Sequence, residues 1–183
     1  MRFAPSLCLL ITVGLLGLSR HYDSGYLWGF ALTWLCGAIY WGWCRFEPAW
    51  HLPLEAMALP WALWGWAKSR YRVGAYFYIG SLTGTALTDG YFYVNGLIPH
   101  WRELMRNEAD PELVRPLLQT ALELVGTSWG GFTAVCLAGI LVAIALKSMT
   151  RVDPARWALA GAIVGTILVD LLFYFTSVRA IGN

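Results

Sequence analysis

The sequence predicts an all-α polytopic membrane protein: a transmembrane helical bundle of about six spans that includes a duplicated helical hairpin. Of the 183 residues, 58% are hydrophobic and 13% are charged, whereas a soluble domain carries about 25% charged residues. The charges cluster in short segments between long apolar runs, as expected for spans and their connecting loops. In addition, two parts of the chain repeat one another in register.

Six apolar stretches are the expected spans, because a membrane-crossing helix needs about 20 apolar residues, with a range of about 17 to 25. The first is slightly short, and we interpret it as a retained helix because no small-residue cleavage site follows it. The third contains Glu55 and Pro60, so it is either a short buried span or a re-entrant segment. The stretches cover roughly residues 3–18, 26–44, 53–67, 73–95, 128–147 and 157–178.

A long polar connection, residues 99–127, contains an expected amphipathic helix over about 110–125. Asp110 is a suitable N-cap, and Pro111 is a suitable first helical residue. Apolar side chains then recur on one face and charged side chains on the other. The pattern indicates a helix that lies in the membrane interface or docks on a partner.

The internal repeat is the most informative feature. Residues 80–93 and 161–174 share the pattern G-x-x-x-G-T-x-L-x-D-x-x-F-Y, and a K-S-x-x-R-V loop precedes each copy. Apolar helices match easily by chance, but charged residues and paired glycines in register do not. We therefore interpret 53–95 and 128–178 as two copies of one helical hairpin, a parallel repeat about an axis along the membrane normal. Both belong to a single domain, 1–183.

The repeat also predicts topology, because it places both K-S-x-x-R-V loops at one face of the bundle. Basic residues mark the cytoplasmic side of membrane proteins, so these loops are expected in the cytoplasm and both termini on the other side. Without the third span, the chain would have five helices and the N-terminus would change sides. The basic face would collect Arg20, Lys68, Arg70, Arg72, Lys147, Arg151 and Arg156.

Two pairs of glycines lie at four-residue spacing in the repeat, where they would let helix backbones approach closely. The pairs are Gly80 with Gly84 and Gly161 with Gly165. Either the two repeated helices pack against each other near a pseudo-twofold axis, or each pair accommodates a different helix.

The repeat carries two equivalent acids, Asp89 and Asp170, each with a threonine one turn earlier, Thr85 and Thr166. Hydroxyl and carboxylate would then share a helical face. A charge at the bilayer centre costs roughly 2.5 to 3.5 kcal/mol on insertion scales. These acids must therefore face the bundle interior, be protonated, or reach the headgroups, which makes them a candidate intramembrane polar site.

Other ionisable residues enter from the same side of the membrane. His51 and Glu55 are four residues apart, and His100 follows the fourth span. With the two aspartates they could form a metal, cofactor or cation site, or they could serve as hydrogen-bond partners and interface anchors. Either histidine could ligate a haem or a chlorophyll, but no ligand spacing indicates a particular metal or cofactor.

Several function classes lack their signatures. The sequence contains no nucleophile elbow, HExxH, P-loop or paired-carboxylate motif. The basic residues lie in short loops rather than on one continuous face, which excludes a nucleic-acid-binding surface. The cysteines have no Cys-x-x-Cys spacing and predict neither a disulfide framework nor a zinc site. They all lie in apolar stretches: Cys8, Cys36, Cys44 and Cys136.

Two resemblances can be read from short motifs. Pro53-Leu54-Glu55 is similar to the Pro-x-Glu-Glu stretch of membrane-embedded carotenoid cyclases, although Ala56 stands where those enzymes have a second Glu. The segments 51–56, 88–93 and 98–102 together resemble a family of small uncharacterised integral membrane proteins of cyanobacteria. That resemblance implies the thylakoid or plasma membrane of a phototroph and no established activity.

These observations favour a non-enzymatic accessory, scaffold or assembly component of a membrane complex, for example a photosynthetic one. Its partners would be membrane lipids and other integral membrane proteins. One alternative is a small transporter or ion-handling protein that uses Asp89 and Asp170. Another is a membrane-embedded enzyme that acts on an isoprenoid or lipid, in which Glu55 takes part.

Overall fold

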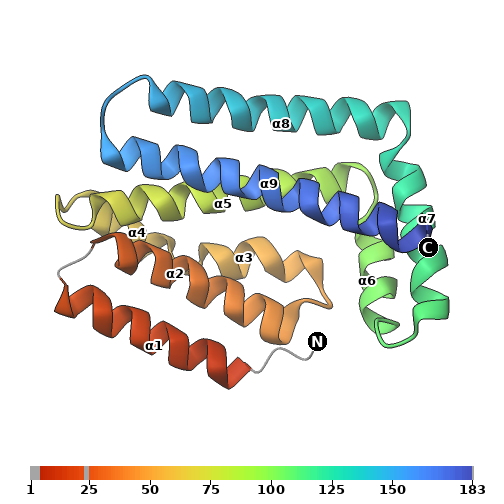
Figure 1. Ribbon diagram of the computed structural model, residues 1–183, viewed down its shortest axis with the longest axis horizontal. Helices are drawn as coiled ribbons and strands as arrows, with labels where there is room; N and C mark the ends of the chain where they lie inside the picture. The colour runs from red at the N-terminus through yellow and green to blue at the C-terminus, as the bar shows by residue number, and fades with distance from the viewer. Residues whose placement is uncertain (1–4, 23–24, 183) are drawn as a thin grey trace.

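A computed structural model of the chain describes residues 5–22 and 25–182, and within them every regular element is helical. The all-α prediction is confirmed. Most helices lie side by side along the long axis, and α6 and α7 lie across one end (Figure 1). The expected start of the first span, residues 3 and 4, falls outside the described residues.

The first half of the chain begins with a helical hairpin of α1 and α2. A π-helix, η1, continues α2, and the 3-10 helix η2 leads into the next segment. A π-helix holds one extra residue per turn and is often found at functional sites. The bounds are α1 Pro5–His21, α2 Gly25–Ile39, η1 Tyr40–Cys44 and η2 Pro48–Trp50.

The third expected span is a broken helix. Pro60 lies in the first turn of α4, and proline cannot donate the backbone hydrogen bond that would continue the preceding helix. The Tyr78 hydroxyl donates a hydrogen bond to the Glu55 carbonyl at the break. The segment therefore consists of α3 His51–Glu55, the 3-10 helix η3 Ala56–Ala58 and α4 Leu59–Trp66.

The second half contains five helices. The amphipathic helix expected over about 110–125 is confirmed as α7, and the Asp110 side chain accepts a hydrogen bond from the Glu112 amide. The sequence analysis missed α6, which follows a turn at Gly96, a glycine with a φ of +65°. The bounds are α5 Arg72–Val94, α6 Ile98–Arg106, α7 Pro111–Val125, α8 Ser128–Met149 and α9 Pro154–Gly182.

Helix α5 lies at the centre of the bundle. Its most extensive contact is with α9, and it also packs on α2 and α4, while α8 covers α9 and α1 covers α2 (Figure 1). Two apolar clusters fill these contacts. One joins α2, η3, α4 and α5 at Cys36, Ala58, Ala62 and Tyr78, and the other joins α8 and α9 at Leu141, Ala145, Ala160 and Ile163.

The two basic loops lie at the same end of the bundle, as predicted. Arg72, at the start of α5, donates a hydrogen bond of 2.7 Å to Asp153, just before α9. The end of α9 lies at the opposite end of the bundle, whereas α1 begins about midway along it (Figure 1).

Within the described residues, α8 and α9 are long and apolar enough to cross a membrane. The count of six spans is therefore not confirmed. Helix α5 is long enough, but its polar residues lower its hydropathy; α1 and α2 are shorter, and the third stretch is broken. Large apolar side chains on both α8 and α9 are exposed, among them Val135, Leu146, Leu168 and Leu172.

The glycine pairs behave differently from each other. A Cβ at Gly80 would lie 2.6 Å from the Leu159 carbonyl oxygen, and one at Gly84 would overlap Thr166, so this pair brings α5 against α9 as predicted. The prediction was wrong for Gly161 and Gly165, where a Cβ would meet nothing within 4 Å. Both glycines border an open pocket beside α5 and do not touch its backbone, so the contact of α5 with α9 lacks the symmetry expected of a pseudo-twofold axis.

Candidate functional site

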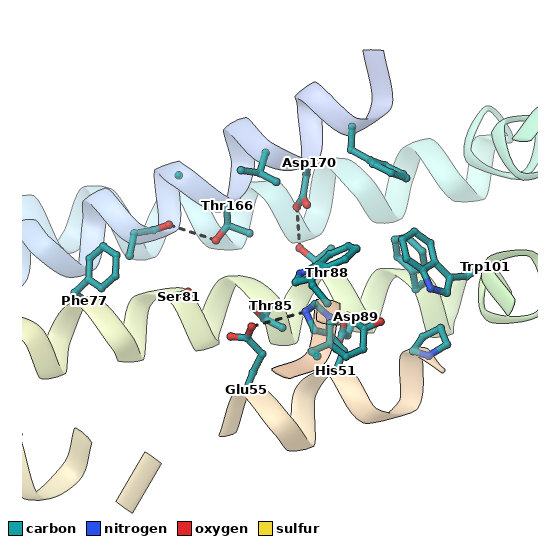
Figure 2. A pocket seen from close by; sticks show the side chains of 18 of the residues that line it. His51, Glu55, Phe77, Ser81, Thr85, Thr88, Asp89, Trp101, Thr166 and Asp170 are labelled. Carbon is teal, nitrogen blue, oxygen red and sulfur yellow. Dashed lines mark hydrogen bonds and ion pairs between the residues drawn. The ribbon is translucent and has the colours of Figure 1, made fainter. Parts of the chain in front are cut away.

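The predicted polar residues meet in one pocket of about 440 Å³ between α5, α9, α3 and η1. We call it the acidic pocket, after the ionisable residues His51, Glu55, Asp89 and Asp170 that line it (Figure 2). Thr85 and Thr166 line it too, whereas His100 does not and lies in a neighbouring pocket. The structure thus brings together every predicted polar residue except His100.

The short helix α3 places His51 and Glu55 one turn apart, so both side chains point at α5. The Nδ1 atom of His51 lies 2.8 Å from Oδ1 of Asp89. Its Nε2 atom lies 3.9 Å from Oε1 of Glu55. An ionised carboxylate can only accept, so an ionised Asp89 requires the proton on Nδ1 and leaves Nε2 as the basic nitrogen of a neutral ring.

Aromatic side chains from the π-helix hold the His51 ring. Tyr40 stacks on it with ring centroids 4.1 Å apart, and Trp41 meets it edge-on at 6.2 Å. Tyr40 was not predicted, and Trp41 was expected to serve membrane packing rather than a pigment or the polar site. The stacking fixes the ring plane, and Asp89 then fixes which nitrogen faces Glu55.

The second oxygen of Asp89 stands out. Its Oδ2 atom is buried and has no hydrogen-bond partner among the described residues. The residue as a whole is 9% exposed. A buried polar atom without a partner costs roughly 1 to 3 kcal/mol. Such an atom on the wall of a pocket is accounted for most simply by a ligand or water that supplies the missing hydrogen.

Asp170 is held from the other side of the acidic pocket. Thr88 of α5 donates a hydrogen bond of 2.8 Å to its Oδ2 atom. The expected threonine partners do not take this role, since Thr166 donates instead to the Ala162 carbonyl of its own helix at 3.3 Å. Thr88 was missed because the equivalent position of the second copy is Val169, so the repeat pattern does not include it.

The rest of the wall is a mixture of small, hydroxyl and aromatic residues. Residues 77, 81, 85, 88, 89 and 92 recur on one face of α5, as helical spacing requires. Gly161 and Gly165 form the facing wall on α9, where the missing side chains leave space. Phe77 and Trp101 lie toward opposite ends of the row (Figure 2). The pocket is therefore long, largely aromatic, and acidic toward its Trp101 end.

No group of three or more His, Cys, Asp or Glu side chains among residues 5–22 and 25–182 is placed to hold a metal ion. At His51, Asp89 engages Nδ1 at 2.8 Å, whereas Nε2 lies 3.9 Å from Glu55 and makes no hydrogen bond to it. The Nδ1 atom of His100 lies 3.3 Å from the Gly96 carbonyl oxygen at an exposed position.

Ion pairs fasten α6 over the mouth of the acidic pocket. Arg102 donates two hydrogen bonds to Glu47, of 2.8 and 2.9 Å. Arg45 donates one of 2.7 Å to Glu108, and the Trp101 indole donates one of 2.7 Å to the Arg45 carbonyl. Trp101 is thereby held against the end of the pocket by contacts outside the apolar part of the bundle.

The pair Glu47–Arg102 makes the docking of α6 dependent on pH. The hydrogen bonds from Arg102 hold the pKa of the Glu47 carboxyl below its ordinary value of 4.5. A carboxyl whose pKa is lower in the folded state stabilises the fold above its ordinary pKa, and this contribution is lost as pH falls through the folded value. We expect amides of residues 98–106 to exchange modestly faster at pH 4 than at pH 7, by hydrogen–deuterium exchange corrected for intrinsic rates.

The control for this effect is Glu47→Gln, which removes the titrating group. The variant should exchange faster than the original at pH 7 and show less additional loosening at pH 4. Equal pH responses of the two proteins in this segment would contradict the assignment.

Comparison with known proteins identifies the family. No curated protein and no solved structure matches the chain. A family model described as "Protein of unknown function (DUF3120)" matches residues 1–178. Since the match spans nearly the whole sequence, the chain belongs to the DUF3120 family.

Proposed function

We propose that this protein is an integral membrane protein in which α1, α2 with η1, the broken α3–α4 segment, α5, α8 and α9 form six passes. A soluble protein would bury its most apolar helices, whereas α8 and α9 expose large apolar side chains along their length. The clustering of basic loops at one end supports a cytoplasmic position for that end. The sequence resemblance adds a cyanobacterial thylakoid or plasma membrane to the proposal.

Within that membrane, the function that the geometry supports best is an enzyme that exchanges protons with an isoprenoid or other lipid-class molecule. The observation that carries it is the His51–Asp89 pair on the wall of a pocket, with an unpartnered carboxylate oxygen beside it. A histidine oriented by a carboxylate is a common general base. The aromatic walls favour an apolar body for the ligand, because such surfaces bind by excluding water.

In the proposed reaction, one proton is removed from the bound molecule and one is returned to it. His51 Nε2 takes a proton from the bound molecule, and the imidazolium that forms lies between the Asp89 and Glu55 carboxylates, which stabilise its charge. The imidazolium then returns this proton at another atom of the molecule, so that the ring ends neutral, as it began. The net result is a shift of a double bond or a ring closure, with no oxidant, reductant or second substrate.

An accessory or assembly role, the first expectation from the sequence, receives less support. It relied on small size, close-packing glycines, many aromatic residues and one amphipathic helix that could dock on a partner. The apolar face of α7 lines a pocket together with α8 and α9 of the same chain, so this face is turned inward.

Ion handling is the second candidate, because Asp89 and Asp170 line the same pocket. In that case purified protein in vesicles would dissipate a pH gradient, and replacing both aspartates by Asn would stop the flux. Lipid composition would not change.

The enzyme proposal is tested by His51→Asn in native cells that lack the chromosomal gene. Deletion is expected to change the abundance of at least one isoprenoid or lipid. His51→Asn should leave that change uncorrected at normal protein level, because it removes the proton-exchanging ring. The matched control His21→Asn, an exposed residue that lines neither pocket of the bundle, should restore the original profile, measured by mass spectrometry of whole lipid and pigment extracts.

Two outcomes would contradict the proposal. One is a lipid and pigment profile that is the same with and without the gene. The other is full restoration by His51→Asn.

A further inference from the structure

A second pocket, of about 510 Å³, adjoins the acidic pocket beneath α6 and α7. Its walls come from α5 to α9 and are mainly aliphatic, for example Leu104, Leu118, Leu137, Leu141 and Leu171. The acidic pocket, in contrast, is walled by aromatic and polar side chains. We call this aliphatic space the chain pocket.

Helix α7 covers one side of the chain pocket, but its side chains do not fill the space. Its apolar side chains Leu117, Leu118, Ala121, Leu122 and Val125 all line the space, yet α7 contributes no buried residue. An amphipathic helix normally buries its apolar stripe against the protein core. Burial of apolar surface stabilises by roughly 25 cal/mol per Å². The partly exposed apolar face of α7 would therefore gain stability from an apolar molecule that covers it.

The two pockets share a wall. Thr88, Phe92, Trp101, Asp170 and Phe173 line both of them. The Thr88–Asp170 hydrogen bond therefore lies at the junction between an acidic, aromatic space and an aliphatic one. A molecule that extends through both would have one polar region and one long apolar region.

We infer that the chain pocket holds the aliphatic chain of an amphiphile whose polar or reacting part lies in the acidic pocket. This inference rests on the proposed function and names the ligand class more closely. The polar group is a hydroxyl or an amine, because carboxylates at Glu55, Asp89 and Asp170 would repel an anionic group and the unpartnered Asp89 oxygen lacks a hydrogen-bond donor. Fatty acids and phosphate-headed lipids are thereby excluded as the preferred ligand.

A protein segment is a poorer occupant for the same space. The roof of α6 and α7 is fastened to the rest of the bundle by Arg102–Glu47 and Arg45–Glu108, and a partner helix would have to break both ion pairs to enter. A flexible chain can enter laterally from the membrane without displacing α7. The mainly aliphatic lining also offers a protein few sites for specific hydrogen bonds.

The experiment uses three photoreactive probes of equal chain length, a long-chain alcohol, the corresponding amine and the corresponding carboxylic acid, each with a diazirine at the chain end. The purified protein in detergent is irradiated, and the labelled residues are mapped by mass spectrometry. The alcohol and the amine should label α7 and α8 residues of the chain pocket. The carboxylic acid should label them about tenfold less, which corresponds to about 1.4 kcal/mol of binding free energy.

Ala121→Trp fills the chain pocket, and Thr120→Trp, on the exposed side of α7, is its matched control. Ala121→Trp should reduce labelling by about tenfold or more, and Thr120→Trp should leave it unchanged. Labelling spread equally over the exposed faces of α1 and α8 would mean ordinary lipid contact and would overturn the inference. Preference for the carboxylic acid would also overturn it.

The design separates this inference from the proposed function. His51→Asn should retain chain-pocket labelling, because it alters no residue of that pocket. If labelling follows the expectation but His51→Asn leaves the cellular lipid profile unchanged, the enzyme proposal fails and the binding site stands. If His51→Asn changes the profile and Ala121→Trp does not change labelling, the chain pocket fails alone.

Discussion

Gly74→Ala is expected to destabilise the bundle by more than about 3 kcal/mol, or to prevent its accumulation, because overpacking against rigid neighbours is costly. Gly74 is buried in α5, and its added Cβ would overlap the backbone of α2 at the Gly25 carbonyl and lie 2.8 Å from the Gly29 amide nitrogen. These neighbours are backbone atoms, so no side-chain rotation relieves the contact. The two helices would have to separate.

Gly165→Ala is the matched control and should change stability in the opposite direction. Its added Cβ meets nothing within 4 Å, and alanine is favoured over glycine in a helix interior by about 0.8 to 1.0 kcal/mol. Thermal unfolding in mild detergent, followed by circular dichroism, measures both variants. Similar shifts in midpoint for the two substitutions would contradict a close backbone contact between α2 and α5 at Gly74.

Asp89→Asn is expected to abolish the proposed activity without lowering thermal stability. The amide keeps an acceptor for the His51 Nδ1 hydrogen, which lies 2.8 Å from Oδ1 in the original protein. It also removes a charge from the bundle interior, where a charge costs roughly 2.5 to 3.5 kcal/mol, and replaces the unpartnered Oδ2 by a group that can donate. We therefore expect an unfolding midpoint that is equal or higher, together with the lipid profile of the deletion strain.

Asp170→Asn is the comparison for this effect. Asp170 differs from Asp89 because its Oδ2 atom already accepts a hydrogen bond from Thr88. Asp170→Asn should therefore raise the unfolding midpoint less than Asp89→Asn does. A midpoint that falls sharply for Asp89→Asn would mean that His51 is protonated and that the substitution breaks a buried ion pair, which costs about 3 to 5 kcal/mol. That outcome would contradict the neutral His51 on which the proposed base depends.

Much of the acidic pocket could be foreseen from residue types alone. Asp89 and Asp170 stand in helices whose other residues are mostly apolar, and burial within the bundle is the least costly place for them. His51 and Glu55 were joined to them by spacing and by side of the membrane. His100 satisfied the same criteria, but α6 presents Trp101 to the acidic pocket and His100 to the neighbouring pocket.

The details of the pocket could not be foreseen because they depend on rotation and on local breaks. A helix of given sequence can present any of its sides to a neighbour, so Gly161 and Gly165 could equally have packed or lined a space. The placement of Tyr40 depends on a π-helix, and the break that follows Glu55 is bridged by the Tyr78 hydroxyl of α5. Asp89 and Asp170 match in the repeat, yet they have different partners because α3 is short and broken whereas its counterpart α8 is continuous.

Local information was enough to establish the helical class, the boundaries of α7 and the meeting of the two basic loops at one end. Hydropathy, capping side chains and charge act over a few residues, and they can therefore be read along the chain. The partner of each buried carboxylate, the faces that α5 and α9 turn to each other and the joining of two pockets at Thr88 and Asp170 were decided by packing. Such contacts join residues more than 30 positions apart, as in His51–Asp89 and Thr88–Asp170, and no pattern along the chain records them.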